Sequence, residues 1–221
     1  MNIRIASYNV HNTDGSQSIS GIGEEIRNIC ADFVGLQELD VGVGRSKRLD
    51  TLGEINKICG YSSAVFSKAI DYDGGEYGIG ALFSYPIVSM QKFLLPFSGE
   101  QRILIKLVLE TEVGHISFYN THLSYNDKAA RELQFKFISE LLSNEKKFIM
   151  TGDFNVDSFD EFLPLGNVKL ANNNDNPITT FKSGGCIDNI IISENMYFES
   201  VLLSLSDFSD HNMIYADIKL D

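Results

Sequence analysis

The sequence predicts an α/β fold in which two β-sheets pack together and helices cover their outer faces. The 221 residues contain eleven short segments rich in β-branched or aromatic residues, and three segments whose apolar residues recur at helical spacing. Apolar residues make up 43% of the chain, which is enough for a sizeable core. No linker, repeat or low-complexity block interrupts the chain, so we expect one domain over residues 1–221.

The expected strands are distributed along the whole chain, and many have turn residues at their ends. They cover residues 3–9, 33–37, 64–69, 80–83, 87–95, 103–110, 115–122, 147–151, 187–192, 201–205 and 213–220. Periodicity alone does not decide the order of these strands within the sheets.

Three helices are expected from apolar stripes. The first stripe consists of Ile19, Ile22, Ile26 and Ile29. The second consists of Leu52, Ile55, Ile58 and Cys59, and it ends at Gly60. The third consists of Ala130, Leu133, Phe137 and Leu141, and it follows the candidate caps Asn126 and Asp127.

The charge balance is acidic, with a net charge of -12 and a pI of about 4.7. Nucleic-acid-binding proteins usually carry a basic face, because contacts to phosphates supply most of their affinity. The acidic total therefore disfavours a general DNA-binding protein, although a local basic groove remains compatible with it.

The N-terminus lacks the features of a signal peptide, and no apolar run is long enough to cross a membrane. Three cysteines are too few and too widely spaced for a disulfide framework or a zinc site. Cys30 and Cys59 fall on apolar helical faces, which favours packing in the core. We expect a cytoplasmic protein, and a monomer.

The stretch TGDFNVDSFDEF (151–162) resembles the start of a calcium-binding EF-hand loop, since Asp153, Asn155 and Asp157 alternate. That loop also requires Gly at its sixth position and Glu at its twelfth. Ser158 and Pro164 occupy these positions here, so the EF-hand interpretation fails. The preceding apolar run predicts a buried strand that ends in polar residues.

Five segments share this pattern, in which an apolar run stops at a hydrogen-bonding or charged residue. The residues are Asn9, Glu38, Asn120 with His122, Asp153 with Asn155, and Asp210 with His211. A sixth segment places Asp188 at the start of a strand. Charged groups beside buried strands cost free energy unless they are paired or bind a cation. With Asp40 as a further candidate, the set indicates one shared cleft, and its oxygen-rich ligands suit Mg²⁺ or Mn²⁺.

Each residue also has an ordinary structural explanation. A single Gly-Asp dipeptide is most often a turn, Glu38 could be a solvated strand end, and Asp210 could cap a turn. The recurrence of the same ligand types favours a site for the set as a whole. His115 follows a Gly in a hairpin-like turn and is expected to be structural or exposed, while the role of His11 stays open.

Six motifs in order, SYNVH, LQELD, NTHLS, GDFN, IDNIII and SDHNMI, resemble the endonuclease/exonuclease/phosphatase superfamily of metal-dependent phosphohydrolases. They extend from residue 7 to residue 214. The resemblance implies a four-layer α/β/β/α sandwich of the DNase I type. The stretches RS with a later Asp, and KAIDYDGGEYG, resemble more closely the bacterial metal-dependent hydrolases of this superfamily.

The resemblance also implies roles for individual residues. Glu38 resembles the main metal carboxylate, with Asn9 beside it and Asp210 as an additional metal or water-positioning carboxylate. Asp153 resembles the residue that orients the attacking water, and His211 a phosphate-contacting histidine oriented by Asp188. The expected contacts to the phosphate or the rest of the substrate come from Asn155, His122, Arg102, Asn120 and Arg45.

These expectations lead to a Mg²⁺- or Mn²⁺-dependent phosphohydrolase that cleaves a phosphoester by in-line attack of water. A phosphodiesterase or phosphatase acting on a small molecule, a sugar phosphate or a lipid head group is favoured. A nuclease is the first alternative, with RSKR (45–48) as the one basic cluster near a motif, and a non-catalytic binding module is the second. A Rossmann or P-loop interpretation fails, because the required glycine spacing and Gly-Lys-Ser/Thr motif do not occur.

Overall fold

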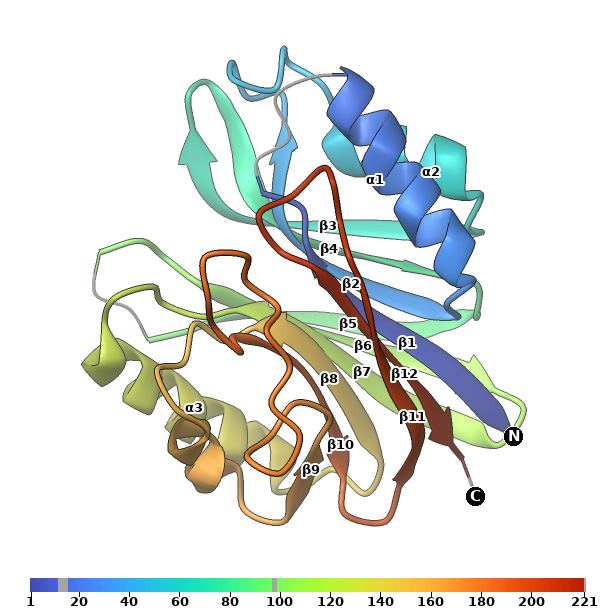
Figure 1. Ribbon diagram of the computed structural model, residues 1–221, viewed down its shortest axis with the longest axis vertical. Coiled ribbons are helices and arrows are strands. Elements are labelled where there is room, and N and C mark those ends of the chain that lie inside the picture. Colours follow the sequence, from blue (N-terminus) through green and yellow to red (C-terminus); the bar gives the residue numbers. More distant parts are fainter. Residues whose placement is uncertain (12–15, 97–98, 221) are drawn as a thin grey trace.

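Two sheets of six strands pack face to face in the computed structural model, which describes residues 1–11, 16–96 and 99–220 (Figure 1). The first sheet has the order β11 (Tyr197–Ser204), β12 (Met213–Lys219), β1 (Asn2–Asn9), β2 (Phe33–Val41), β4 (Gly75–Phe83), β3 (Ser63–Tyr72). The second has the order β5 (Ile87–Leu94), β6 (Ile103–Thr111), β7 (Gly114–His122), β8 (Phe148–Asp153), β10 (Asp188–Ser193), β9 (Val168–Leu170).

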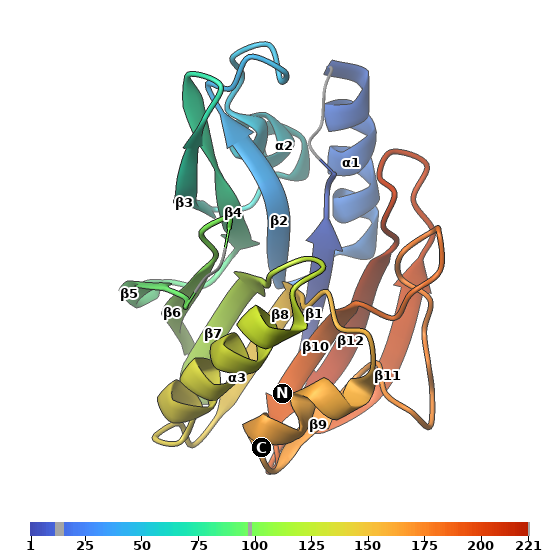
Figure 2. The same cartoon turned by 90° about the vertical axis from the view of Figure 1, so that its left-hand side faces the viewer.

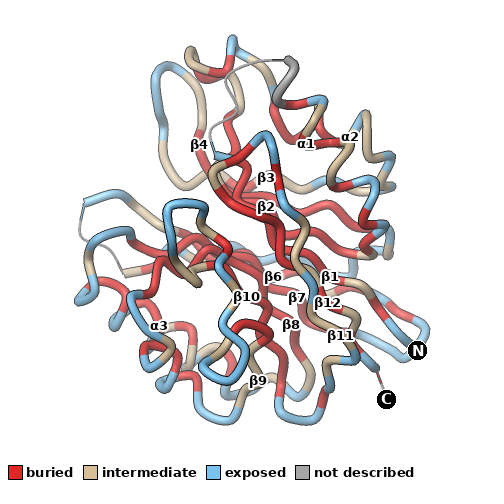
Figure 3. Tube along the Cα trace, in the orientation of Figure 1, coloured by how far each residue is buried: buried red, intermediate tan, exposed pale blue. Residues whose placement is uncertain are grey.

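The helices lie on the two outer faces. Helices α1 (Ser16–Ile29) and α2 (Thr51–Cys59) cover the first sheet, while α3 (Lys128–Leu142) and a 3₁₀ helix, η1 (Phe159–Leu165), cover the second (Figure 2). One apolar layer lies between the sheets, and a further apolar layer lies under the helices on each side. In Figure 3 the strands in the centre of the molecule are coloured mostly as buried, as expected for strands packed between these layers. The α/β/β/α sandwich expected from the sequence is therefore confirmed.

Strand pairing brings the polar strand ends to one end of the sandwich. Strands β7 and β8 are parallel, and His122 lies opposite Asp153. Strand β10 runs antiparallel to β8, so Asp188 at its start pairs with Asp153 at the end of β8. In the facing sheet, β1 and β2 are parallel and place Asn9 beside Gln37.

Each of the eleven expected strands overlaps a strand of the structure. Strand β9 and the 3₁₀ helix η1 were not expected. Both follow the polar end of β8, where short elements of three and seven residues give no sustained periodicity.

The predicted buried face of α3 is only partly correct, since Ala130 is buried and Phe137 and Leu141 pack against the core as half-buried residues. Leu133 of the expected stripe is exposed, whereas Arg131 and Gln134 are buried together with Phe135 and Ile138. Successive helical residues differ by about 100° around the axis, so the true face is rotated by one residue from the expected one. Hydrogen-bond partners make the burial of the two polar side chains possible.

The expectation that Cys30 packs in the core is also wrong. Its φ angle is 53°, its side chain is exposed, and it lies just beyond the last residue of α1, whereas Cys59 is half-buried. Among the described residues, no helix is long and apolar enough to cross a membrane.

Candidate active site

The centre of the site is a chain of three buried side chains. The Oδ2 atom of Asp188 lies 2.8 Å from Nδ1 of His211, and Nε2 of His211 lies 3.8 Å from Oδ2 of Asp153. Burial alone would lower the pKa of His211, but the charges of Asp188, Asp153 and Asp210 raise it to about 9. His211 is therefore an imidazolium at neutral pH, held at Nδ1 by Asp188 and directing Nε2 toward the carboxylate of Asp153.

Asp153 collects hydrogen bonds from several segments. Its Oδ2 accepts from Asn9 Nδ2 at 2.9 Å, and its Oδ1 accepts from the backbone N–H of Asn155 at 3.0 Å. Burial and the nearby charge of Asp188 raise the pKa of Asp153 above its usual range, while the charge of His211 opposes that shift. A raised pKa suits a carboxylate that takes up a proton during a reaction.

A second imidazole lies on the opposite side of Asp153. His122 is buried, with Nε2 3.5 Å from Asp153 Oδ2 and Nδ1 3.2 Å from Nη1 of Arg102. Burial and the positive charges of Arg102 and His211 hold the pKa of His122 well below its usual value. A neutral ring accepts from Arg102 at Nδ1 and carries its proton on Nε2, facing Asp153.

The first sheet contributes Glu38 and Asn9. The pairing of β2 with β4 shifts register between Leu36 and Leu39, and Glu38 has a φ of 61° within this irregularity. Left-handed non-glycine residues are uncommon and are concentrated at functional sites. The bulge lets Glu38 contact the strand-end amide of Asn9, whose Nδ2 donates to Oε1 at 3.2 Å. Burial raises the pKa of Glu38 despite this hydrogen bond.

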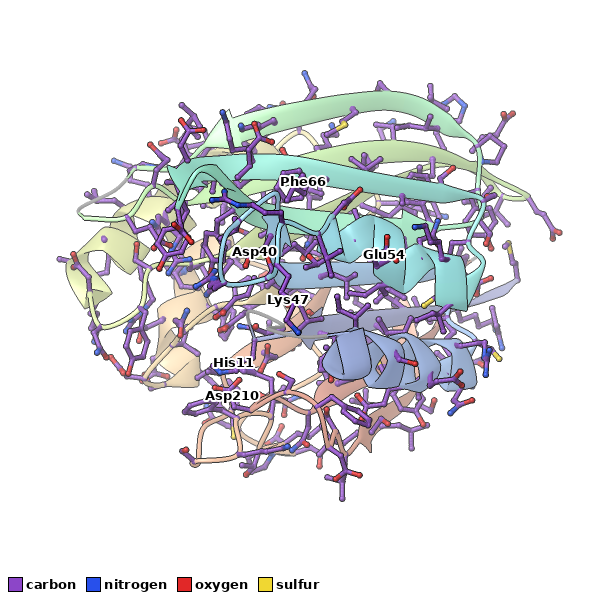
Figure 4. The ribbon with its side chains drawn as sticks, turned by 90° about the horizontal axis from the view of Figure 1, so that it is seen from above. His11, Asp40, Lys47, Glu54, Phe66 and Asp210 are labelled. Carbon is purple, nitrogen blue, oxygen red and sulfur yellow. The ribbon has the colours of Figure 1, made fainter. Side chains whose placement is uncertain are left out.

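Most of these groups line one cavity of about 610 Å³, whereas Asn9 and Asp188 are fully buried and do not line it. Its wall includes Glu38, Arg102, His122, Asp153, Asn155, Asp210 and His211. Tyr125, Asn126, Val156, Asp157, Phe181, Gly184, Gly185 and Ile187 complete the wall together with His11. His11, whose role the sequence left open, lies at the mouth with Nδ1 3.1 Å from Oδ1 of Asp210 (Figure 4).

Asn155 lines the cavity, but its backbone conformation is not the extended one that was expected. An extended chain would have placed Asp153 and Asn155 on the same side, but Asn155 has a φ of 52° and the strand has already ended. Its Nδ2 donates to the carbonyl of Leu123 at 3.1 Å. The left-handed turn therefore brings the amide to the cavity wall.

Asn120 lies elsewhere than expected. It is fully buried between the sheets, where it donates to the carbonyls of Leu36 and Gly80 and accepts from Gln37. Alternation along β7 does place it on the same side as His122, but two residues deeper in the sandwich. Its amide therefore joins the two sheets and has no position in the cavity wall.

Arg45 and Asp40 also lie outside the cavity wall. Arg45 makes a bidentate ion pair with the buried carboxylate of Asp40, and its guanidinium lies over the rings of Tyr72 and Tyr77. This ion pair and these rings hold the Arg45 side chain outside the cavity wall, and its contact with the substrate stays a prediction. Arg48 is likewise hydrogen-bonded to the carbonyls of Gly42 and Asp73.

The donor set fits a divalent cation. Oδ1 of Asp188 is a buried carboxylate oxygen without a hydrogen bond among the described residues, while Oδ1 of Asp210 has as its nearest partner the Nδ1 of the exposed His11 at 3.1 Å. Ligand atoms of Asp153, Asp188 and His211 lie within 4.8 Å of one another, but Asp188 is already paired to a protonated His211. Because Asp188 and His211 already bind each other, the carboxylates of Glu38 and Asp210 are the better ligand pair. Asn9 turns its Nδ2 toward Glu38 and Asp153, and its Oδ1 accepts the backbone N–H of His11 at 3.0 Å, so its expected role as a metal ligand stays a prediction.

Tyr125 and Phe181 are site residues that the sequence did not indicate. Phe181 lies 5.0 Å from the ring of His211, with which it also forms an isolated β-bridge. Tyr125 is largely exposed at the cavity mouth. Both occupy irregular segments that have no hydrophobic period, so the only available signal was their proximity in sequence to the motifs.

Comparison with known proteins supports these observations. The profile of the Endonuclease/Exonuclease/phosphatase family matches residues 6–211. A search of curated proteins found no match.

Several solved structures have the same fold. An endonuclease/exonuclease/phosphatase family protein from Bacteroides thetaiotaomicron is 19% identical, with a TM-score of 0.80 over 100% of this chain and 98% of that one. A mannosyl-6-phosphatase from the same organism is 19% identical, with a TM-score of 0.75 over 99% and 100% of the two chains. The human Nocturnin catalytic domain, solved with a bound sulfate anion, is 19% identical, with a TM-score of 0.80 over 100% and 95%.

The family profile begins within β1 and ends just before β12. It includes every residue that lines the cavity. The chain belongs to the endonuclease/exonuclease/phosphatase family.

Proposed function

We propose that the protein is a divalent-metal-dependent phosphohydrolase that acts on a small phosphate ester. The observation that carries this proposal is the convergence of the Asp188–His211–Asp153 chain and Glu38 on one cavity. Hydrolysis requires a base for water and positive charge near the phosphoryl oxygens, and this arrangement supplies both.

In the proposed reaction, Asp153 aligns the attacking water and accepts its proton. His211 donates a hydrogen bond from Nε2 to a phosphoryl oxygen, while Asp188 keeps the ring charged and oriented. Arg102, neutral His122 and the amide of Asn155 bind the remaining phosphoryl oxygens. A cation held by Glu38 and Asp210 would offset negative charge on the phosphate and the leaving oxygen.

The charge around the cavity favours a small substrate over nucleic acid. Arg102 is the single Arg or Lys in the cavity wall among the described residues, whereas Asp157 and Asp210 place carboxylates there. Two arginines of the RSKR cluster are occupied by hydrogen bonds within their own loop. A polyanion would therefore meet Arg102 and the imidazolium of His211 in the cavity, and an acidic surface around it, with a net charge of -12 for the chain.

A sugar monophosphate or another ester with an uncharged leaving group matches the rest of the wall. Tyr125, Phe181 and Ile187 offer apolar and aromatic surface beside the hydrogen-bonding amide of Asn126. The structural similarity to a mannosyl-6-phosphatase is compatible with this substrate class. A nuclease remains the second candidate, since the family includes endonucleases and exonucleases.

A substrate screen tests the proposal. Purified protein with Mg²⁺ or Mn²⁺ is assayed on sugar monophosphates, aryl phosphomonoesters and phosphodiesters, phospholipids, and single- and double-stranded DNA and RNA. We expect small esters to be hydrolysed, with His211→Ala reducing turnover at least ~100-fold. Preferred cleavage of DNA or RNA would replace the substrate assignment, and turnover that survives His211→Ala would remove the proposed mechanism.

A further inference from the structure

Helix α3 carries an arginine that is almost completely buried. Arg131 is 1% exposed, which is rare for a residue whose charge is strongly hydrated. It lies on the face of α3 that packs toward the 3₁₀ helix η1 and the loop that follows β8 (Figure 2). No role in the proposed chemistry involves it directly, since it does not line the cavity.

The guanidinium of Arg131 joins three separate segments. Its Nε and Nη2 atoms donate to the two carboxylate oxygens of Glu161 at 2.8 and 3.1 Å. Nη2 also donates to Oδ2 of Asp157 at 2.6 Å, and Nη1 donates to the carbonyl of Ser124 at 3.3 Å. Glu161 in turn accepts the backbone N–H of Asp157 at 2.8 Å.

The segments that Arg131 joins form one wall of the candidate active site. The segment after β7 supplies Tyr125 and Asn126, and the segment after β8 supplies Asn155, Val156 and Asp157. The backbone at Asn155 is left-handed, and its own hydrogen bonds are one to Asp153 and one to Leu123. The next residue with such contacts is Asp157. Its backbone N–H donates to Glu161, and its carboxylate accepts from Arg131.

Stability alone does not account for this ion pair. Replacing a buried ion pair by apolar side chains of similar volume is often neutral or stabilising, because both charges lose their hydration on burial. Directional hydrogen bonds to a planar guanidinium, in contrast, fix the relative positions of the groups that they join. Arg131 therefore contributes mainly by fixing the relative positions of Ser124, Asp157 and Glu161.

We propose that Arg131 is a positioning residue of the active site, which fixes the segment 154–157 through Glu161 and Asp157 and so sets the position of the Asn155 amide. This inference rests on the proposed function, because it assigns Asn155 a contact with the substrate phosphate. It adds a residue on α3, directly behind the cavity wall, on which that contact depends.

The test uses a variant that removes both buried charges together. Arg131→Met with Glu161→Leu eliminates the ion pair without leaving one charge unpaired, and the exposed carboxylate of Asp157 can be hydrated. We expect its unfolding midpoint in urea to stay close to that of the wild type. We expect kcat/KM on the best substrate from the screen to fall roughly 10- to 100-fold, because small misplacements of a binding group have effects of this size. An unchanged kcat/KM would overturn the inference.

A double-mutant cycle separates positioning from general disruption. In an Asn155→Ala background, the same Arg131/Glu161 substitutions should reduce kcat/KM by no more than about threefold, since the group that they position is already missing. The full reduction in that background would show that Arg131 does not act through Asn155. If the double substitution prevents folding, Arg131→Lys provides the same cycle, because it keeps the charge but loses the bidentate geometry.

A control for general loss of charged contacts is the cluster around Glu145, which contacts strands β6 and β7 of the sheet that α3 covers. Glu145 accepts hydrogen bonds from Lys106, from Ser117 at 2.7 Å and from Tyr119 at 2.9 Å, and it lines hollows away from the active-site cavity. Glu145→Gln should leave kcat/KM within about twofold of the wild type, even where it lowers the unfolding midpoint. A loss comparable to that of the Arg131/Glu161 variant would show that any weakened cluster has the same effect.

Hydrogen exchange distinguishes failure of this inference from failure of the proposed function. If the wild-type protein hydrolyses no phosphoester, the proposed function fails, and amide exchange still tests the positioning role. Backbone amides of residues 154–158 should exchange faster in the Arg131/Glu161 variant and at the wild-type rate in Glu145→Gln. Unchanged exchange in the Arg131/Glu161 variant would overturn the inference whatever the substrate.

Discussion

Substituting Asp188 by Asn should shift the alkaline limit of activity. The carboxylate of Asp188 is fully buried and lies 2.8 Å from Nδ1 of His211, and it is the leading cause that raises the pKa of that ring from 6.5 to about 9. A shift of this size corresponds to about 3 kcal/mol in favour of the protonated ring. Asn keeps the size of the side chain and removes its charge, so the pKa of His211 should fall toward its ordinary value of 6.5, with Asp153 and Asp210 left to oppose the effect of burial.

The sign follows from the role of His211 as a cationic donor. Activity requires the protonated ring, so it falls as pH rises through the pKa of His211. With a pKa of about 9, the ring is about 99% protonated at pH 7 and about 76% at pH 8.5. With a pKa of about 6.5, the corresponding values are about 24% and about 1%. Asp188→Asn should therefore lose up to about fourfold in activity at pH 7 and up to about 80-fold at pH 8.5 from protonation alone, with the larger loss at the higher pH.

The assay is kcat/KM between pH 6 and pH 10 at saturating Mg²⁺, for the wild type, Asp188→Asn and the remote control Glu145→Gln. The control should reproduce the wild-type profile. The difference between the two losses isolates protonation from any constant loss caused by a misoriented ring, which scales the whole profile. A ratio of wild-type to Asp188→Asn activity that is the same at pH 7 and pH 8.5 would refute the assignment of His211 as a cation maintained by Asp188.

Three further outcomes are expected. Glu38→Gln should weaken Mn²⁺ binding at least ~10-fold by calorimetry, because it removes the main carboxylate ligand, and unchanged affinity would transfer that role to other residues. Asp40→Ala should lower the free energy of unfolding by roughly 1–3 kcal/mol in urea titrations, because it removes the buried partner of Arg45. The folded variant should keep its kcat/KM, because this ion pair lies outside the cavity wall. Lost activity at wild-type stability would mean that Arg45 contacts the substrate. Gly35→Ala should destabilise the protein by roughly 1–3 kcal/mol or more. The added Cβ would lie 2.0 Å from Oγ1 of Thr151 and 2.7 Å from Oδ1 of Asn120 in the facing sheet. Wild-type stability would mean that the two sheets separate easily at this position.

The strands and the identity of the site were predictable because both depend on local patterns. Strand ends that carry Asn9, Asp153 and Asp188 could be read from the junctions of apolar runs with polar residues, whereas Glu38, expected just beyond a strand, lies at a bulge inside β2. That these ends meet depends on pairing between distant strands, which alternation does not encode. The order of the family motifs supplied the missing topology.

Depth in the sandwich could not be predicted. Asn120 and His122 alternate onto the same side of β7, yet only His122 reaches the cavity, because Asn120 lies where the two sheets are in contact. The same pattern of residues therefore gives one side chain that joins the sheets and one in the site. Only the packing distance between the sheets separates these two outcomes.

Buried polar side chains on α3 escaped prediction for a related reason. An arginine and a glutamine in a helix are normally assigned to the solvent face. The acceptors that allow Arg131 to be buried come from Ser124, Asp157 and Glu161, in segments without regular periodicity. Partners that are distant in sequence thus shifted the buried face of the helix by about one residue.

An anomalous difference map from crystals soaked in Mn²⁺ tests the central claim most directly. We predict a strong peak within about 2 Å of a carboxylate oxygen of Glu38, with His211 still bound through Nδ1 to Asp188 and not to the ion. A peak whose ligands are Asp153, Asp188 and His211, with Glu38 uninvolved, would contradict the division of the site into a metal carboxylate and a charged histidine.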